Sequence, residues 1–211
     1  MKFSSLAAAA ALVVSVSSQA APVMALDYSG GLNFIRGSFA NFGWSFTISE
    51  QRWVTALGLL DLGPVGLNDA HQVGIWNTAG QLLVTTTVDN AASQVASSSG
   101  IGTWRYADVA TTLLDIGEYV IGAYYPSTAD AFRAQVQVED VAPWLTFGDS
   151  LVTLGAFGDQ FGMPYAVSSA GAPGFLGPNF VSQEVPEPAS LVLMLAGLSV
   201  LALAMRRRPR G

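Results

Sequence analysis

The sequence predicts an all-β fold, an antiparallel β-sandwich, between an N-terminal signal peptide and a C-terminal single transmembrane helix. Three observations predict the sandwich. Several stretches of the middle region alternate apolar and polar residues with a period of two, as half-buried strands do. Glycines and prolines, 22 and 10 in the chain, separate these stretches. The middle region shows no convincing amphipathic helix. Jelly-roll-like and immunoglobulin-like topologies are both compatible with this pattern.

The N-terminus has the three parts of a secretory signal peptide. Lys2 supplies a positive charge, residues 6–16 are apolar, and Ser18-Gln19-Ala20 offers small residues at a cleavage position. Cleavage is expected between Ala20 and Ala21, which makes residues 1–20 the signal peptide. Val23-Met24-Ala25 is a weaker second choice.

Seven stretches of the middle region are expected to be strands: 43–49, 53–60, 72–76, 82–88, 103–106, 119–125 and 131–138. In the last of them Phe132, Ala134, Val136 and Val138 share one face, so this strand is half buried. The stretches at 53–60, 72–76 and 119–125 are apolar on both faces and suit central strands.

Turn signals lie between these strands. Asn77-Thr78-Ala79-Gly80 is typical of a hairpin turn, because Gly80 can take a positive φ. Residues 61–69 form a longer loop, and the Ser/Ala-rich residues 91–100 are expected to be a mobile surface loop.

Composition limits the partners of the exported portion. Its 15 acidic residues are opposed by only four arginines, which leaves a net charge of −11 with His71 neutral. Such a surface repels nucleic acid and anionic lipid, so neither is expected as a lasting partner. The chain has no cysteine, so a packed core has to replace disulfides.

The C-terminal end carries an apolar segment and a basic cluster. Residues 189–205 are 17 residues without a charge, followed by Arg206, Arg207, Arg208 and Arg210. As a helix the segment spans about 25 Å, slightly less than a bilayer core. The arginines favour the cytoplasmic side as a stop, which leaves the preceding residues outside. A buried core helix and a permanent tail anchor are the alternatives.

Val185-Pro186-Glu187-Pro188, the apolar segment and the arginines together resemble the PEP-CTERM sorting signal of Gram-negative bacteria. The resemblance implies cleavage by an exosortase near the Pro-Glu-Pro box and sorting to the cell surface or the exterior. It also implies an association with exopolysaccharide, after a transient stay in the inner membrane. With signal peptidase at the other end, the expected division is 1–20, signal peptide; 21–184, sandwich; 185–211, sorting signal.

The middle region is similar to an uncharacterised β-sandwich family of bacterial exported proteins. The resemblance rests on Trp53–Gly58, His71–Asn77, Gly80–Leu83 and Gly117–Tyr125, and covers roughly residues 42–138. It implies a fold and brings no activity, cofactor or catalytic residue with it.

Two short patterns suggest chemistry that the rest of the sequence does not support. Phe147-Gly148-Asp149-Ser150-Leu151 matches the serine motif of GDSL esterases, in which Ser150 would be the nucleophile. That family's histidine base lies downstream, and this chain has no histidine after His71. His71 itself is expected at a strand start, hydrogen-bonded to its turn. We therefore expect no catalytic residue and no enzyme activity.

Ligand binding is left as two further hypotheses. Asp61, Asp69, Asp149 and Asp159 are expected in loops and could converge as the carboxylate pair that a glycosidase needs. Calcium that clamps a loop is a separate hypothesis, although no EF-hand spacing is present and no metal site is assigned. A carbohydrate-binding module is the alternative function, with Trp104 and Tyr106 after the Ser-rich stretch as the ligand-facing aromatic residues.

Overall fold

The computed structural model describes residues 21–34, 39–154, 159–168, 175–185 and 197. Residues Ala20–Val185 form one compact unit, here called the body. The second unit comprises Met1–Gln19 and Pro186–Gly211 and, apart from Gly197, lies outside the described residues. Its predicted signal peptide and transmembrane helix are therefore not described.

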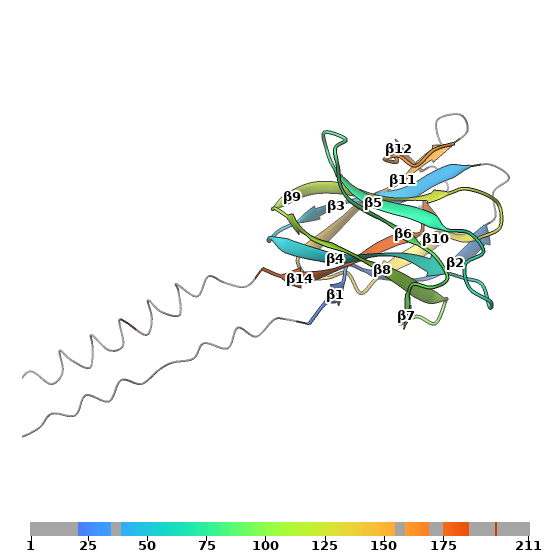
Figure 1. Cartoon of the computed structure of the whole chain (residues 1–211), viewed down its shortest axis with the longest axis horizontal. Coiled ribbons are helices and arrows are strands. Elements are labelled where there is room, and N and C mark those ends of the chain that lie inside the picture. Colours follow the sequence, from blue (N-terminus) through green and yellow to red (C-terminus); the bar gives the residue numbers. More distant parts are fainter. Residues whose placement is uncertain (1–20, 35–38, 155–158, 169–174, 186–196, 198–211) are drawn as a thin grey trace, which may run out of the picture. The chain divides into compact units, whose positions relative to one another are not determined.

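The body is an all-β fold of antiparallel sheets (Figure 1). Its strands are β1 (Val23–Met24), β2 (Asp27–Phe34), β3 (Ala40–Ile48), β4 (Arg52–Asp61), β5 (His71–Asn77), β6 (Leu82–Val88), β7 (Ser93–Ala96), β8 (Thr103–Leu114), β9 (Gly117–Tyr125), β10 (Phe132–Glu139), β11 (Leu145–Leu154), β12 (Ala166–Val167), β13 (Phe175–Leu176) and β14 (Pro178–Glu184).

Three sheets are formed by these strands. The five-stranded sheet has the order β1-β14-β4-β8-β7, the six-stranded sheet β12-β11-β3-β9-β5-β6, and the three-stranded sheet β13-β10-β2. The strands expected to be central, β4, β5 and β9, each have a neighbour on both sides. Their apolar residues on both faces fit this position, because a central strand of a sandwich meets less water.

The two larger sheets pack face to face through aromatic rings. Phe180 of β14 has its ring centroid 6.1 Å from that of Trp44 and 5.1 Å from that of Phe46, both on β3. Trp44 also donates a hydrogen bond from Nε1 to the carbonyl oxygen of Pro178, at 2.8 Å. The arrangement is that of a β-sandwich, with the core between the two sheets.

The three-stranded sheet contacts both larger sheets. Phe132 of β10 packs on Phe42 of β3, with centroids 4.2 Å apart, and Tyr28 of β2 meets Trp104 of β8 edge-on at 5.3 Å. The predicted inward face of residues 131–138 is confirmed, because Phe132, Ala134 and Val136 are buried.

The turn at residues 77–80 is confirmed. Gly80 has φ +79° and donates a backbone hydrogen bond to Asn77, 3.0 Å long, between the antiparallel strands β5 and β6. The side-chain oxygen of Asn77 also accepts from the backbone N–H groups of Ala79 and Gln81. This is the amide chemistry that favours asparagine in turns.

Two expectations need correction. The surface loop expected at 91–100 instead contains β7, an edge strand paired with β8, followed by a turn closed by the bond from Gly100 N–H to Ser97 O. The strand expected at 103–106 continues to Leu114. In the first case pairing with β8 decides the conformation, although the local composition favours a loop. In the second case pairing with β4 extends the strand to Leu114.

We predict that Gly43→Ala destabilises the body, because β3 and β9 meet too closely there for a side chain. A Cβ on Gly43 would lie 1.9 Å from the carbonyl oxygen of Ile121. Thermal unfolding of the purified protein should show a loss of about 2–3 kcal/mol. Gly162→Ala is the control, since a Cβ there meets nothing within 4 Å. Equal melting temperatures for both variants would contradict this packing.

Candidate functional site

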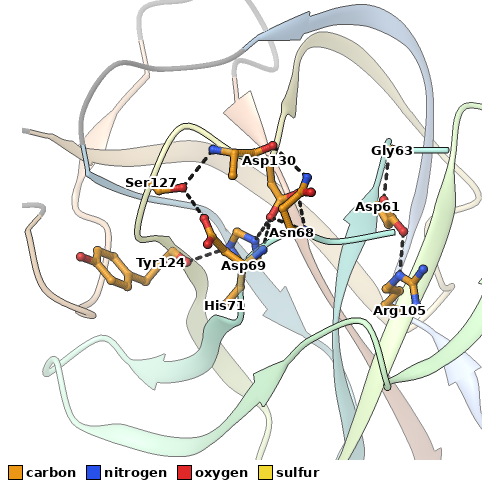
Figure 2. Close-up of polar contacts among 10 residues, drawn as sticks. Asp61, Gly63, Asn68, Asp69, His71, Arg105, Tyr124, Ser127 and Asp130 are labelled. Atoms are coloured by element: carbon orange, nitrogen blue, oxygen red, sulfur yellow. Dashed lines mark hydrogen bonds and ion pairs between the residues drawn. The ribbon is translucent and has the colours of Figure 1, made fainter. Parts of the chain in front are cut away.

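A buried histidine and aspartate join two loops at one end of the body (Figure 2). His71, the first residue of β5, is fully buried. Its Nε2 lies 3.0 Å from Oδ2 of Asp130, and its Nδ1 lies 3.0 Å from the carbonyl oxygen of Tyr124. Both partners are hydrogen-bond acceptors, so both ring nitrogens are occupied by contacts within the body.

Asp130 also accepts hydrogen bonds from the loop that precedes His71. The backbone N–H groups of Asn68 and Asp69 donate to its carboxylate at 2.9 and 2.8 Å, and the Asn68 side chain donates at 3.0 Å. Burial alone would raise the pKa of Asp130. The hydrogen bonds from His71, Asn68 and Asp69 outweigh burial and hold the pKa far below its usual 3.8.

This cluster is not arranged as a nucleophile with its base. Ser127 is the neighbouring hydroxyl, and it donates to the carboxylate of Asp69 rather than to His71 (Figure 2). Both nitrogens of His71 are engaged, so the ring has no free position from which to accept a serine proton. The expected place of His71 at a strand start is confirmed. Its side-chain partners, Asp130 and Tyr124, lie far away along the chain rather than in the adjoining turn.

Ser150 of the esterase-like motif lies on β11 and is 6% exposed. β3 and β9 separate β11 from β5, the strand of His71. At about 4.8 Å per strand the two strands are about 14 Å apart. The motif is therefore part of a strand in an all-β fold, and its serine and the histidine are not neighbours.

The four loop aspartates considered as a carboxylate pair take separate positions. Asp61 forms a buried ion pair with Nε of Arg105 at 2.7 Å and accepts from Gly63 N–H at 2.9 Å (Figure 2). The carboxylate of Asp69 accepts a hydrogen bond from the Ser127 hydroxyl. Asp149 lies on β11. The backbone oxygen of Asp159 accepts a hydrogen bond from the Tyr124 hydroxyl. Within the described part of the chain, no three His, Cys, Asp or Glu residues gather as metal ligands do.

The expectation that Trp104 and Tyr106 face a ligand is wrong. Trp104 is fully buried and Tyr106 is 4% exposed. Trp104 points inward because Nε1 donates to the buried carboxylate of Asp27, at 3.0 Å. Ser97 and Ser98 donate to the same carboxylate. Burial alone would raise the pKa of Asp27, but the hydrogen bonds from Ser98, the Tyr28 N–H and Trp104 outweigh it and lower this pKa.

The predicted sorting residues lie at the edge of the described region. Glu184 ends β14, and its carboxylate is 3.9 Å from the guanidinium of Arg52, which stacks 4.6 Å from the ring of Trp144. Val185 is described, as is Ala21. Ala20, Pro186, Glu187, Pro188 and the arginines 206, 207, 208 and 210 lie outside the described residues. Among the residues that are described, no helix has the length and apolar character needed to cross a bilayer.

Comparison with known families adds one finding. Residues 184–208 match the PEP-CTERM protein-sorting motif. The match contains the Pro-Glu-Pro box, the apolar segment and three of the arginines. No curated protein matches the chain. The sorting motif predicted from the sequence is thus confirmed, and it begins at the residue that ends β14.

We predict that Asp130→Asn lowers the free energy of unfolding by about 2 kcal/mol at neutral pH, because a buried charged acceptor is lost. The folded-state pKa of Asp130 is depressed, so its contribution is present above the unfolded pKa of about 3.9 and is lost as the pH falls below it. The variant should therefore lose less stability than the wild type on acidification.

Denaturant unfolding between pH 7 and pH 3 measures this difference. Asp108→Asn is the control, because Asp108 is exposed. This substitution should leave the change in the free energy of unfolding between pH 7 and pH 3 as it is in the wild type. A constant gap between wild type and Asp130→Asn over the whole range would contradict the assigned pKa.

Proposed function

We propose that this chain, which carries a PEP-CTERM sorting motif at its C-terminus, is a non-enzymatic protein of the cell surface or extracellular matrix. The motif implies an exported protein that an exosortase sorts. The finer proposal is that the body remains outside the cell in association with exopolysaccharide. The single observation that carries it is the match at residues 184–208.

The proposed path has three steps. Signal peptidase cleaves between Ala20 and Ala21 while the chain crosses the inner membrane. The apolar segment at 189–205 then holds the chain in that membrane, with the arginines on the cytoplasmic side. An exosortase cleaves near Pro186-Glu187-Pro188 and frees the body.

The position of the motif supports cleavage without damage to the fold. The last strand, β14, ends at Glu184, and the Pro-Glu-Pro box starts two residues later. A cut in or after the box leaves every strand of the body intact. Arg52, which is 3% exposed, lies beside Glu184 and belongs to the body as well.

Two observations support a role without catalysis. The catalytic motif considered from the sequence has its serine, Ser150, on a different strand from the single histidine. That histidine uses both ring nitrogens to hold Asp130 and Tyr124. The acidic body, with 14 acidic residues against four arginines and hence a net charge of −10, suits a protein that stays soluble outside the cell.

We predict that replacing Pro186, Glu187 and Pro188 by alanine leaves an unprocessed form in the inner membrane. The exosortase no longer recognises the altered box, whereas the apolar segment still holds the chain in the membrane. Fractionation followed by mass spectrometry of both termini measures this outcome, and the wild-type product should begin at Ala21. A host without its exosortase is the control and should accumulate the same unprocessed form. Equal masses for wild type and variant would contradict cleavage at the box.

We also predict that the purified protein hydrolyses short-chain ester substrates no faster than its Ser150→Ala variant. Ser150 is buried on β11 and His71 lies three strands away, so His71 cannot take the serine proton. Steady-state assays of both proteins decide the point. Turnover by the wild type that the substitution abolishes would make the protein a hydrolase.

A further inference from the structure

A groove of about 280 Å³ lies on the outer face of the six-stranded sheet. Its polar side chains come from Ser45, Thr47, Thr78, Glu118 and Asp149. Ser45 and Thr47 alternate along β3 with Trp44, Phe46 and Ile48, which face the core. The side chains of Ser45 and Thr47 therefore point outward. Thr47 and Glu118 are directly opposite each other on β3 and β9. The floor is thus two paired strands, and the 77–80 turn supplies Thr78.

A β-bulge in β11 builds the other side of the groove. Phe147 is opposite Phe46 and Ser150 is opposite Trp44, so Gly148 and Asp149 together oppose the single residue Ser45. The Ser45 hydroxyl accepts the N–H of Asp149 at 2.8 Å. A bulge of this kind changes the direction of the side chain that follows the extra residue. Here it places Asp149 at the groove.

Gly148 is required for this arrangement. A Cβ at this position would lie 2.5 Å from the Ser45 hydroxyl and 3.1 Å from the Ser45 carbonyl oxygen. A side chain at this position would have to displace the Ser45 hydroxyl, which accepts the Asp149 N–H. The glycine and aspartate of the esterase-like motif therefore shape a groove, whereas the buried serine after them does not line it.

The lining determines which ligand chemistry fits. Glu118 and Asp149 are exposed, and their carboxylates make no hydrogen bond or ion pair to any other described residue. Three hydroxyls lie beside them, and the lining residues include no lysine, arginine or histidine. Such a surface repels anions and accepts hydrogen bonds from a donor-rich ligand. Among the described residues no three His, Cys, Asp or Glu side chains gather as ligands of a metal ion.

We propose that the groove between the 77–80 turn and the β11 bulge binds a neutral saccharide unit of a polysaccharide. Sugar hydroxyls donate to Glu118 and Asp149 and exchange hydrogen bonds with Ser45, Thr47 and Thr78. The volume is near the lower end of small-molecule sites, on the order of 300–1,000 Å³, and suits a short stretch of a chain. This inference rests on the proposed function and gives the exopolysaccharide partner a chemical class.

The experiment uses the protein as its host releases it. Native gels that contain galactomannan, dextran or alginate should show retarded migration in at least one of the two neutral polymers and none in alginate. Retardation should persist as salt is raised from low to high concentration, because binding of an uncharged sugar does not depend on an attraction between charges that salt would screen. Retardation by alginate alone, by neither neutral polymer, or only at low salt would overturn the proposal.

Two single substitutions test the groove itself. Asp149→Asn and Glu118→Gln should each weaken the binding of the retarding polymer about tenfold, which is the effect of losing one hydrogen bond to a charged group. Asp108→Asn changes the net charge equally on β8, outside the groove, and should bind as the wild type does. Melting temperatures of all three variants establish that the fold is retained. Unchanged binding by both groove variants would overturn the assignment.

Sorting and sugar binding can fail separately in these tests. Normal cleavage at the Pro-Glu-Pro box without retardation in neutral polymers defeats the groove assignment and leaves the proposed function standing. Retardation by a protein that retains its full C-terminus in the cell defeats the proposed sorting and leaves the groove standing.

Discussion

The packing of Phe180 against Trp44 and Phe46 is the contact on which the fold depends. These rings join the five-stranded and six-stranded sheets, and the chain has no cysteine that could do so covalently. Phe180 belongs to β14, the last strand of the body, which lies between β1 and β4. The residues just before the sorting motif are therefore part of the core. Sorting signal and body adjoin, without a spacer between the end of β14 and the matched residues.

Buried carboxylates attach the loops to this core. Asp27 holds the turn after β7 through Ser97 and Ser98, Asp61 pairs with Arg105, and Asp130 holds the loop before β5. Each carboxylate has several donors, as a buried charge requires. Part of the acidic composition is thus structural. Removing one partner of such a group leaves the other buried and unpaired, which destabilises the fold.

Local patterns predicted one hairpin and seven of the strands, β3–β6 and β8–β10, because alternation and turn residues act over a few positions. They missed the strands β2, β7 and β11. β10 shows its period directly, and Asn77-Thr78-Ala79-Gly80 forms its own turn. The partners of buried polar groups could not be predicted in this way. Asp130 is 59 residues from His71, and Asp27 is 77 residues from Trp104. Trp104 looked exposed beside a serine-rich stretch, yet that stretch and the indole bind the same distant carboxylate. The β11 bulge was likewise hidden in a motif that suggested an esterase.

The pairing of β1 with β14 brings the two ends of the body together. Val23 is opposite Ser182 and Met24 is opposite Val181 in an antiparallel ladder, so residues 21 and 184 leave neighbouring strands at the same edge. Paired strands are about 5 Å apart, a gap that a linker of a few residues can close. The first and last residues of the body therefore lie close together in space. A circular permutant could join residue 185 to residue 21 and open new termini at the exposed 77–80 turn, with every sheet retained.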